Sequence, residues 1–369
     1  MGLEGIVALE SAISFIDGAQ GELVYRGYGI EELAGKASFE EVAHLLWIGS
    51  LPRRKELREL QDFLCAERTL PPMVLDVLRI TPEDANPMAV LRTCVSALAH
   101  FDGEADDMSR EANYRKAMRL TARIPTIIAA FDRIRKGLQP IAPRREGSTA
   151  ENFLYMLRGE DPGPSAKKTF DTALVLHAEH GLNASTFTGR VIGATLADMY
   201  SAITGAIGGL KGPLHGGANV KVMQMLLDLE ASGEDPEAYI RARLARKKRV
   251  MGFGHRVYRT MDPRAAVLRG MLEDLSEERD SRLWLETCDA MARVMAAEKN
   301  INPNVDFYSA PVYYLLGIDV DLYTSLFVMS RITGWAAHLL EQWDNNRLIR
   351  PRAAYTGPRN LRLLPLDRR

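Results

Sequence analysis

The spacing of apolar residues changes its period only once, close to the N-terminus. Within residues 14–27, short runs alternate between apolar and polar positions on either side of Gly18 and Gly21. Alternation with a period of two predicts strands, and glycines between two such runs predict a hairpin turn. Beyond this segment, apolar residues recur every three or four positions, which is the spacing of amphipathic helices. The pattern therefore predicts an all-α fold with one small β-hairpin near the N-terminus.

Local signals predict where several helices begin. Ser38 and Glu41 have the spacing of a capping box, and Asp262 followed by Pro263 predicts an N-cap with proline at the first helical position. Pro125 predicts a kink or a split in the helix that contains it, because proline cannot donate a backbone hydrogen bond. The predicted helices cover about 38–49, 52–67, 71–79, 87–101, 110–136, 149–157, 166–180, 184–208, 219–231, 236–247, 263–277, 282–299 and 320–345.

Glycine pairs suggest how the helices divide into domains. Gly208-Gly209 and Gly216-Gly217 bracket a predicted hinge, and near Gly317 the chain returns from loops to a long helix. We predict a large domain formed by residues 1–216 and 321–369. A small domain, residues 217–320, is inserted into it.

Composition excludes several classes of function. The chain has 369 residues, 46% hydrophobic and 26% charged, and its net charge of -1 gives no overall field that favours nucleic acid or an anionic membrane. The most apolar run, 191–210, contains Asp198 and is too polar to span a bilayer. Cys65, Cys94 and Cys288 are odd in number and scattered, so they predict no disulfide framework and a reducing cytoplasm.

The stretch 249–264 contains a histidine, His255, set beside Gly252 and Gly254. Glycine lacks a Cβ atom, so a flat ligand could approach the backbone closely at these two positions. The stretch also carries forked cations suited to carboxylate or phosphate, namely Arg256, Arg259 and Arg264. A ligand loop that leads into a helix is one interpretation, and a solvated turn is the other.

Two further stretches have a similar character. His215 precedes a helix predicted to begin near Ala218, where positive potential disfavours imidazolium but a neutral ring can still donate to an oxyanion. An unliganded glycine-rich connection is the alternative. Asp306 is either the N-cap of a helix starting near Phe307 or a carboxylate base in a partly apolar pocket.

His177 and His180 are three residues apart, and we predict them on one helix face, where such a pair could chelate a metal ion. No cysteine lies near them and the available partners are arginines, so we predict no metal site. Arg331 lies within a long apolar helix and needs an anionic partner, either an internal carboxylate or a substrate. Together these segments predict carbon–carbon bond chemistry on a polyanion.

The sequence resembles the citrate synthases, specifically their shorter bacterial and archaeal form. The resemblance covers nearly the whole chain and rests on motifs in the expected order, which are Ile13-Ser-Phe-Ile-Asp-Gly18, Gly212-Pro-Leu-His-Gly-Gly-Ala-Asn219, Gly252-Phe-Gly-His-Arg-Val-Tyr258, Asn304-Val-Asp-Phe-Tyr-Ser309 and Arg350-Pro-Arg352. It implies an almost wholly helical homodimer whose two domains close over a cleft. It also implies condensation of oxaloacetate with acetyl-CoA, followed by hydrolysis of the thioester to citrate and CoA.

The resemblance implies a role for each matching residue. Asp306 would remove a methyl proton, His215 would stabilise the enolate, and His255 would polarise and protonate the oxaloacetate carbonyl. The substrate carboxylates would be held by His180, Arg264 and Arg331, with Arg350 contributed across the dimer interface. Arg259 would contact a CoA phosphate, and the backbone at Gly252 and Gly254 would line the adenine site. No tightly bound cofactor is implied, because CoA enters and leaves with the reaction.

Two departures from the family pattern adjoin site residues. Gly181 stands where many relatives have an acid, and Ala310-Pro311 stands where a glycine is usual. The nearest alternative activity is 2-methylcitrate synthesis from propionyl-CoA, because one methylene in a pocket changes binding by only ~1–3 kcal/mol. A non-catalytic helical binding protein is the alternative of a different class.

Overall fold

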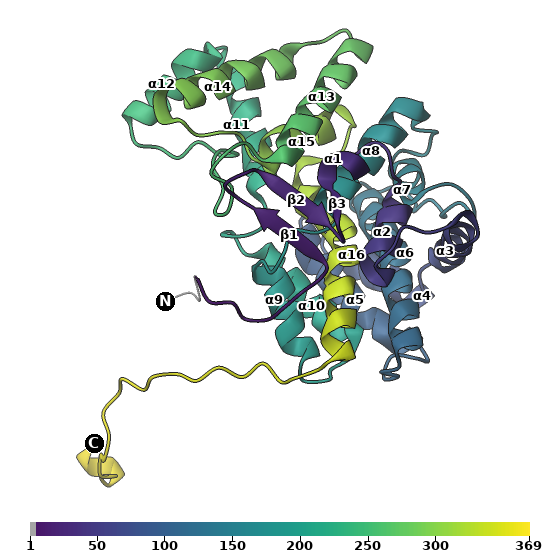
Figure 1. Cartoon of the computed structure of the whole chain (residues 1–369), viewed down its shortest axis with the longest axis vertical. Helices are drawn as coiled ribbons and strands as arrows, with labels where there is room; N and C mark the ends of the chain where they lie inside the picture. The colour runs from purple at the N-terminus through teal and green to yellow at the C-terminus, as the bar shows by residue number, and fades with distance from the viewer. Residues whose placement is uncertain (1–4) are drawn as a thin grey trace.

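The computed structural model describes residues 5–369 and is mostly α-helical, as the sequence predicted (Figure 1). Its one sheet contains β1 Ser14–Asp17, β2 Glu22–Tyr25 and β3 Tyr28–Gly29, antiparallel in the order β1-β2-β3. The predicted hairpin is therefore confirmed. The third strand was not predicted because two residues are too few for an alternating pattern to appear.

Helices account for most of the remaining chain. The α-helices are α1 Ile30–Leu33, α2 Phe39–Ile48, α3 Arg54–Glu67, α4 Pro72–Ile80, α5 Pro87–Leu98, α6 Arg110–Arg135, α7 Thr149–Arg158, α8 Gly163–His177, α9 Ala184–Gly193, α10 Met199–Lys211, α11 Ala218–Ser232, α12 Pro236–Ala245, α13 Pro263–Glu278, α14 Leu283–Lys299, α15 Val305–Leu315 and α16 Tyr323–Asp344. Short 3-10 helices cover Ala99–Phe101, Val320–Leu322 and Leu366–Arg368.

The predicted helix starts are confirmed where a side chain caps the first turn. Ser38 and Glu41 form a reciprocal capping box at α2, and Asp262 caps α13 ahead of Pro263. α11 begins at Ala218, close to the expected residue. The starts of α2 and α13 were predictable because a cap is a contact between near neighbours in the sequence, whereas α11 follows Gly217 without a side-chain cap.

Three helix predictions differ from the structure at positions where local signals compete with packing. The split predicted as one outcome at Pro125 does not occur, and α6 continues through this residue, because buried residues such as Ile124 and Ile127 hold both halves of the helix against the core. The helix predicted over 184–208 is two helices, since Leu196 adopts a positive φ of 65° and Asp198 caps a new helix. α8 ends at His177, three residues earlier than predicted.

α16 is the central helix of the larger helical group. It packs against α2, α5, α6, α8, α9 and α10, and nearly all of its residues are buried. Figure 1 shows it in yellow, running through the middle of this group. The indole of Trp47 donates a 2.9 Å hydrogen bond to the carbonyl of Thr333, which attaches α2 to α16. α11 to α15 form a second cluster, in which α15 contacts both α11 and α13.

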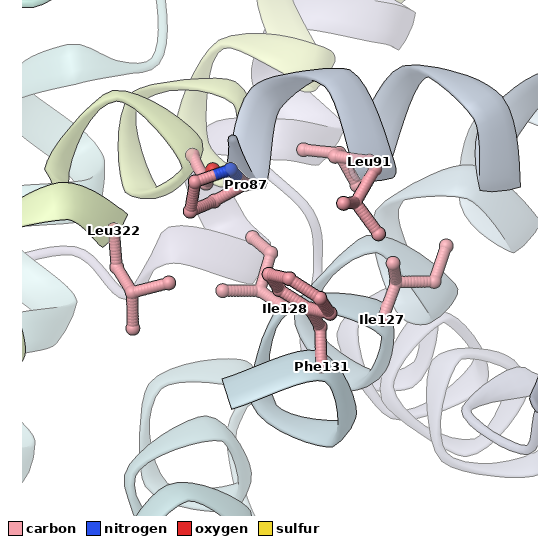
Figure 2. Close-up of a pocket in the computed structure, with 8 residues that line it drawn as sticks. Pro87, Leu91, Ile127, Ile128, Phe131 and Leu322 are labelled. Atoms are coloured by element: carbon pink, nitrogen blue, oxygen red, sulfur yellow. The ribbon is translucent and has the colours of Figure 1, made fainter. Parts of the chain in front are cut away.

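A small pocket of about 10 Å³ lies in the core between α5 and α6 (Figure 2). Its lining is apolar except for one hydroxyl and comprises Pro87, Val90, Leu91, Ile127, Ile128, Phe131, Leu322 and Ser325. It contains none of the candidate site residues, and its volume is barely enough for one water molecule. Among residues 5–369, no helix has the length and apolar character needed to cross a bilayer.

Candidate active site

The site is assembled from two loops that are distant in the sequence but tied together by their backbones. The amide of Gly254 donates to the carbonyl of Asn302 at 3.0 Å, and the amide of Asn304 donates to the carbonyl of Gly252 at 2.9 Å. The Asn304 side chain adds a 2.9 Å hydrogen bond to the carbonyl of Gly254. These bonds hold the loop of His255 beside the start of α15.

Gly252 and Gly254 both adopt positive φ angles, of 81° and 75°. A Cβ atom on Gly252 would lie 2.8 Å from side-chain carbons of Phe307 and Val222, whereas one on Gly254 would meet Ile301 only at 3.5 Å. On the Cβ side of Gly252 the protein's own side chains fill the space, so that a flat ligand would have to approach this backbone from another side. Glycine is needed there for packing as well as for backbone conformation.

One carboxylate, that of Asp262, joins the two halves of the site. Its oxygens accept hydrogen bonds from Arg264 Nε at 3.0 Å, from a terminal nitrogen of Arg264 at 2.8 Å and from the amide of Val305 at 3.2 Å. Burial raises the pKa of Asp262, but the charge and hydrogen bonds of Arg264 outweigh it and hold the pKa below its ordinary value. The sequence identified Asp262 only as a helix cap, and its bond to the Arg264 guanidinium was not predicted.

Asp306 lies in the first turn of α15 and is not its cap. Asn304 is the N-cap residue, and its side chain accepts a 3.0 Å hydrogen bond from the amide of Asp306. Within residues 5–369 the Asp306 carboxylate has no hydrogen-bond partner. Burial raises its pKa to about 6, against the opposing charges of Arg264 and Arg331. The carboxylate is thus a stronger base than an ordinary aspartate and is available to a ligand.

The imidazole of His255 is neutral at pH 7. Burial, followed by the charge of Arg264, lowers the pKa of His255 to about 4. Its Nδ1 accepts from the amides of Val257 at 3.0 Å and Tyr258 at 3.3 Å, which leaves Nε2 to carry the hydrogen.

The ring of His215 is neutral as the sequence predicted, but the main cause is burial. Burial lowers its pKa to about 4, and the charges of Arg331 and Arg256 lower it further. Nε2 of His215 lies 2.8 Å from the hydroxyl of Ser185, at the start of α9. A buried neutral imidazole held in this way can donate a hydrogen bond from its other nitrogen to a developing negative charge.

His180 lies beyond the C-terminus of α8, so the predicted pairing with His177 on one helix face is wrong. His177 bonds through Nδ1 to the carbonyl of Ala173 inside the helix. His180 turns towards the site, where its ring centroid lies 5.2 Å from that of His255. Burial and the charges of Arg264 and Arg331 hold the pKa of His180 well below its ordinary value. In the described part of the chain, no three His, Cys, Asp or Glu side chains gather as they would around a metal ion.

Arg331 is only 1% exposed and lacks a carboxylate partner within the described residues. Its Nε donates to the carbonyl of His177 at 2.8 Å, while one terminal nitrogen has no hydrogen-bond partner. Burial lowers the pKa of Arg331 to about 10, which leaves it charged at pH 7. The internal salt bridge offered as one interpretation is not formed among the described residues, and a buried guanidinium with an unsatisfied nitrogen favours an anionic ligand.

The remaining candidate arginines lie at the surface. Arg256 and Arg259 have exposed side chains, and the amide of Arg259 donates a 2.7 Å hydrogen bond to the carbonyl of Gly18 in the β1–β2 turn. Arg350 is exposed in the C-terminal segment, which extends away from the helical body (Figure 1).

Sequence reasoning assigned no role in the site to Tyr258, although this residue stands only three positions after His255 in the same motif.

Comparisons with known proteins identify what this arrangement resembles. Residues 2–352 match the family described as "Citrate synthase, C-terminal domain". The chain is 52% identical to citrate synthase 2 of Bacillus subtilis, covering 100% of this chain and 98% of that one. It is 46% identical to a 2-methylcitrate synthase of Mycobacterium tuberculosis, over 99% of this chain and 92% of that one. The citrate synthase of Thermoplasma acidophilum, solved as a ternary complex with carboxymethyl coenzyme A and oxaloacetate, superposes with a TM-score of 0.92 at 33% identity, covering 100% of this chain and 98% of that one.

The raised pKa of Asp306 can be measured directly. In protein labelled with ¹³C at aspartate carboxyl carbons, we expect the NMR signal of Asp306 to titrate with a midpoint of about 6. Replacing Arg264 with glutamine should raise this midpoint further, because the guanidinium favours the charged carboxylate. A midpoint near pH 4 in the unaltered protein would contradict the assignment.

The different surroundings of the two glycines predict different costs of substitution. Gly252→Ala should lower the free energy of unfolding by roughly 2–4 kcal/mol, because positive-φ strain adds to overpacking against Phe307. Gly254→Ala is the matched control and should cost only about 1 kcal/mol, since it meets backbone strain alone. Urea unfolding would measure both, and equal losses would show that Phe307 does not restrict this loop.

Proposed function

Since the chain belongs to the citrate synthase family and is an acyltransferase of the citrate (Si)-synthase type, we propose how its site carries out the reaction. The observation that supports the proposal most strongly is the free carboxylate of Asp306, under the influence of the charges of Arg264 and Arg331. Two neutral imidazoles complete the set of groups that the reaction needs: His215, which is affected by the charge of Arg331, and His255, which is affected by that of Arg264.

The first step is removal of a proton from the methyl group of acetyl-CoA by Asp306. A carboxyl with a pKa of about 6 is ionised at pH 7 yet more basic than an ordinary aspartate. General base catalysis contributes only ~10²–10⁴ in rate, so the enolate needs further stabilisation. Neutral His215 supplies it by donating to the thioester oxygen, an effect worth about another 10²–10³.

The second step joins the enolate carbon to the carbonyl carbon of oxaloacetate. Arg331 has an unpartnered N–H group for a substrate carboxylate, and Arg264 and His180 lie in the same charged pocket. His255 polarises the carbonyl with its Nε2–H and transfers that proton to the oxygen as the bond forms. Water then cleaves the C–S bond of citryl-CoA, releasing citrate and CoA.

CoA is a substrate and product in this scheme, and no tightly bound cofactor takes part. We assign a CoA phosphate to exposed Arg259 and the adenine to the backbone around Gly252 and Gly254. Gly252 can contribute its backbone only, because Phe307 and Val222 occupy the space where its side chain would be.

We further propose two domains, residues 1–216 with 321–369 and residues 217–320, which close over the cleft in a homodimer. The separate cluster of α11 to α15 supports this division, although residues 1–4 fall outside the described chain. Arg350 would serve the neighbouring subunit, which fits its exposure in a segment that leaves the helical body. Three free cysteines within residues 5–369 support a reducing cytoplasm, where the enzyme would act in the tricarboxylic acid cycle.

A second candidate function is 2-methylcitrate synthesis, which the 46% identity to the mycobacterial 2-methylcitrate synthase favours. The chemistry is unchanged, and the acyl pocket must only admit one more methylene. A difference of one methylene lets a pocket discriminate between acetyl-CoA and propionyl-CoA by about 10–200-fold at most.

Thiol release from acyl-CoA in the presence of oxaloacetate tests the proposed function. We expect kcat/KM for acetyl-CoA to exceed that for propionyl-CoA by roughly tenfold, the size of a one-methylene effect. Asp306→Gly should abolish turnover while oxaloacetate binding, measured by calorimetry, persists. A preference for propionyl-CoA would select the second candidate, and full turnover by Asp306→Gly would remove this residue from the mechanism.

Mixed dimers test the shared site. Arg350→Ala and Asp306→Gly should each inactivate a homodimer, because they remove a substrate ligand and the base. Co-refolding the two variants should restore up to about a quarter of native activity, if half the dimers are mixed and each has one intact site. Absence of any recovery, with mixed dimers verified by mass, would show that Arg350 does not act across the interface.

A further inference from the structure

Tyr258 contacts two of the site histidines through different groups. Its backbone amide donates to Nδ1 of His255 at 3.3 Å, and its hydroxyl lies 3.2 Å from Nε2 of His180. Its ring centroid is 4.8 Å from that of His255 and 5.6 Å from that of His180. Tyr258 is 4% exposed, so the phenol packs against both imidazoles and lies away from solvent.

The backbone on both sides of Tyr258 is seated on the β1–β2 turn. The amide of Arg259 donates to the carbonyl of Gly18 at 2.7 Å. A Cβ atom on Gly18 would lie only 2.1 Å from the carbonyl oxygen of Val257, so the turn and the loop are in close contact. The position of the phenol is thus fixed by the hairpin as well as by its own loop.

The hydroxyl of Tyr258 can determine which nitrogen of His180 carries the hydrogen. The imidazole is neutral, so one ring nitrogen donates and the other accepts. Within residues 5–369 the Tyr258 hydroxyl has one hydrogen-bonding partner, Nε2 of His180, so its single hydrogen can be donated there. With the hydroxyl as donor to Nε2 of His180, the ring hydrogen of the imidazole resides on Nδ1. Within residues 5–369, Nδ1 has no hydrogen-bond partner of its own.

We propose that Tyr258 is a positioning residue that holds neutral His180 in the tautomer with hydrogen on Nδ1, ready to donate to a substrate carboxylate. The opposite tautomer would present a lone pair to the anion and repel it. The same tyrosine keeps the carboxylate-binding histidine at a fixed spacing from His255, because it contacts both rings. This inference rests on the proposed role of His180 in binding oxaloacetate.

Tyr258→Phe keeps the ring and the backbone amide but removes the hydroxyl. We expect KM for oxaloacetate to rise roughly five- to tenfold, the usual effect of losing one hydrogen bond to a buried group. The kcat value should change by less than about threefold, since the positions of Asp306 and His255 are preserved. ¹⁵N NMR of histidine-labelled protein should show one tautomer of His180 in the native enzyme and a mixture in the variant.

Tyr200→Phe is the matched control, because the Tyr200 hydroxyl is also buried and donates a 2.6 Å hydrogen bond to Asp102, outside the site. Its KM for oxaloacetate should equal the native value. An unchanged KM in Tyr258→Phe, or a hydrogen on Nε2 of His180 in the native enzyme, would overturn the inference. Because the NMR measurement needs no substitution, it decides the question even if the variant fails to fold. Lack of native turnover would instead refute the proposed function.

Discussion

The site depends on the bond between the Asp262 carboxylate and the Arg264 guanidinium. This carboxylate also accepts the amide of Val305, so the charge that binds Arg264 fixes the helix that bears Asp306. Removing one partner of a buried ion pair typically costs about 3–5 kcal/mol, because the other is left uncompensated. Breaking the Asp262–Arg264 pair would change the site as well as the stability of the fold. The orientation of α15 and the electrostatic environment of Asp306 both depend on this pair.

Arg264 and Arg331 are both buried, but they differ in how their charge is balanced. Arg264 has its own carboxylate, whereas Arg331 bonds to a backbone carbonyl and leaves one nitrogen unpartnered within the described chain. A guanidinium that remains unpaired in a protein interior is costly unless a ligand completes its bonding. Arg264 therefore has a carboxylate bonded to it directly, whereas the charge of Arg331 is balanced only at longer range, by Glu179. Burial lowers the pKa of His180, and the charges of Arg264 and Arg331 lower it further, so that its ring is neutral.

The sequence predicted those parts of the site that depend on contacts between near neighbours. The caps at Ser38 and Asp262 and the start of α11 follow from side chains and backbone groups a few residues apart. The motifs located His215, His255 and Asp306, but not the bonds between their loops. Those bonds join Gly254 to Asn302 and Asp262 to Val305, more than forty residues apart, where no local pattern operates. The same limit explains the split that does not occur at Pro125 and the wrong expectation at His180, where tertiary packing determines whether a helix continues.

The anchoring of His180 by the hairpin has a consequence for how the protein matures after synthesis. The hydroxyl of Tyr25 in β2 donates to the carbonyl of Glu179 at 2.7 Å, across 154 residues of sequence. Helices close their hydrogen bonds locally and form within about a microsecond, whereas contacts at such separation form late. A newly made chain therefore gains most of its helical content before its catalytic groups meet. Circular dichroism alone would consequently overstate the fraction of competent enzyme during renaturation.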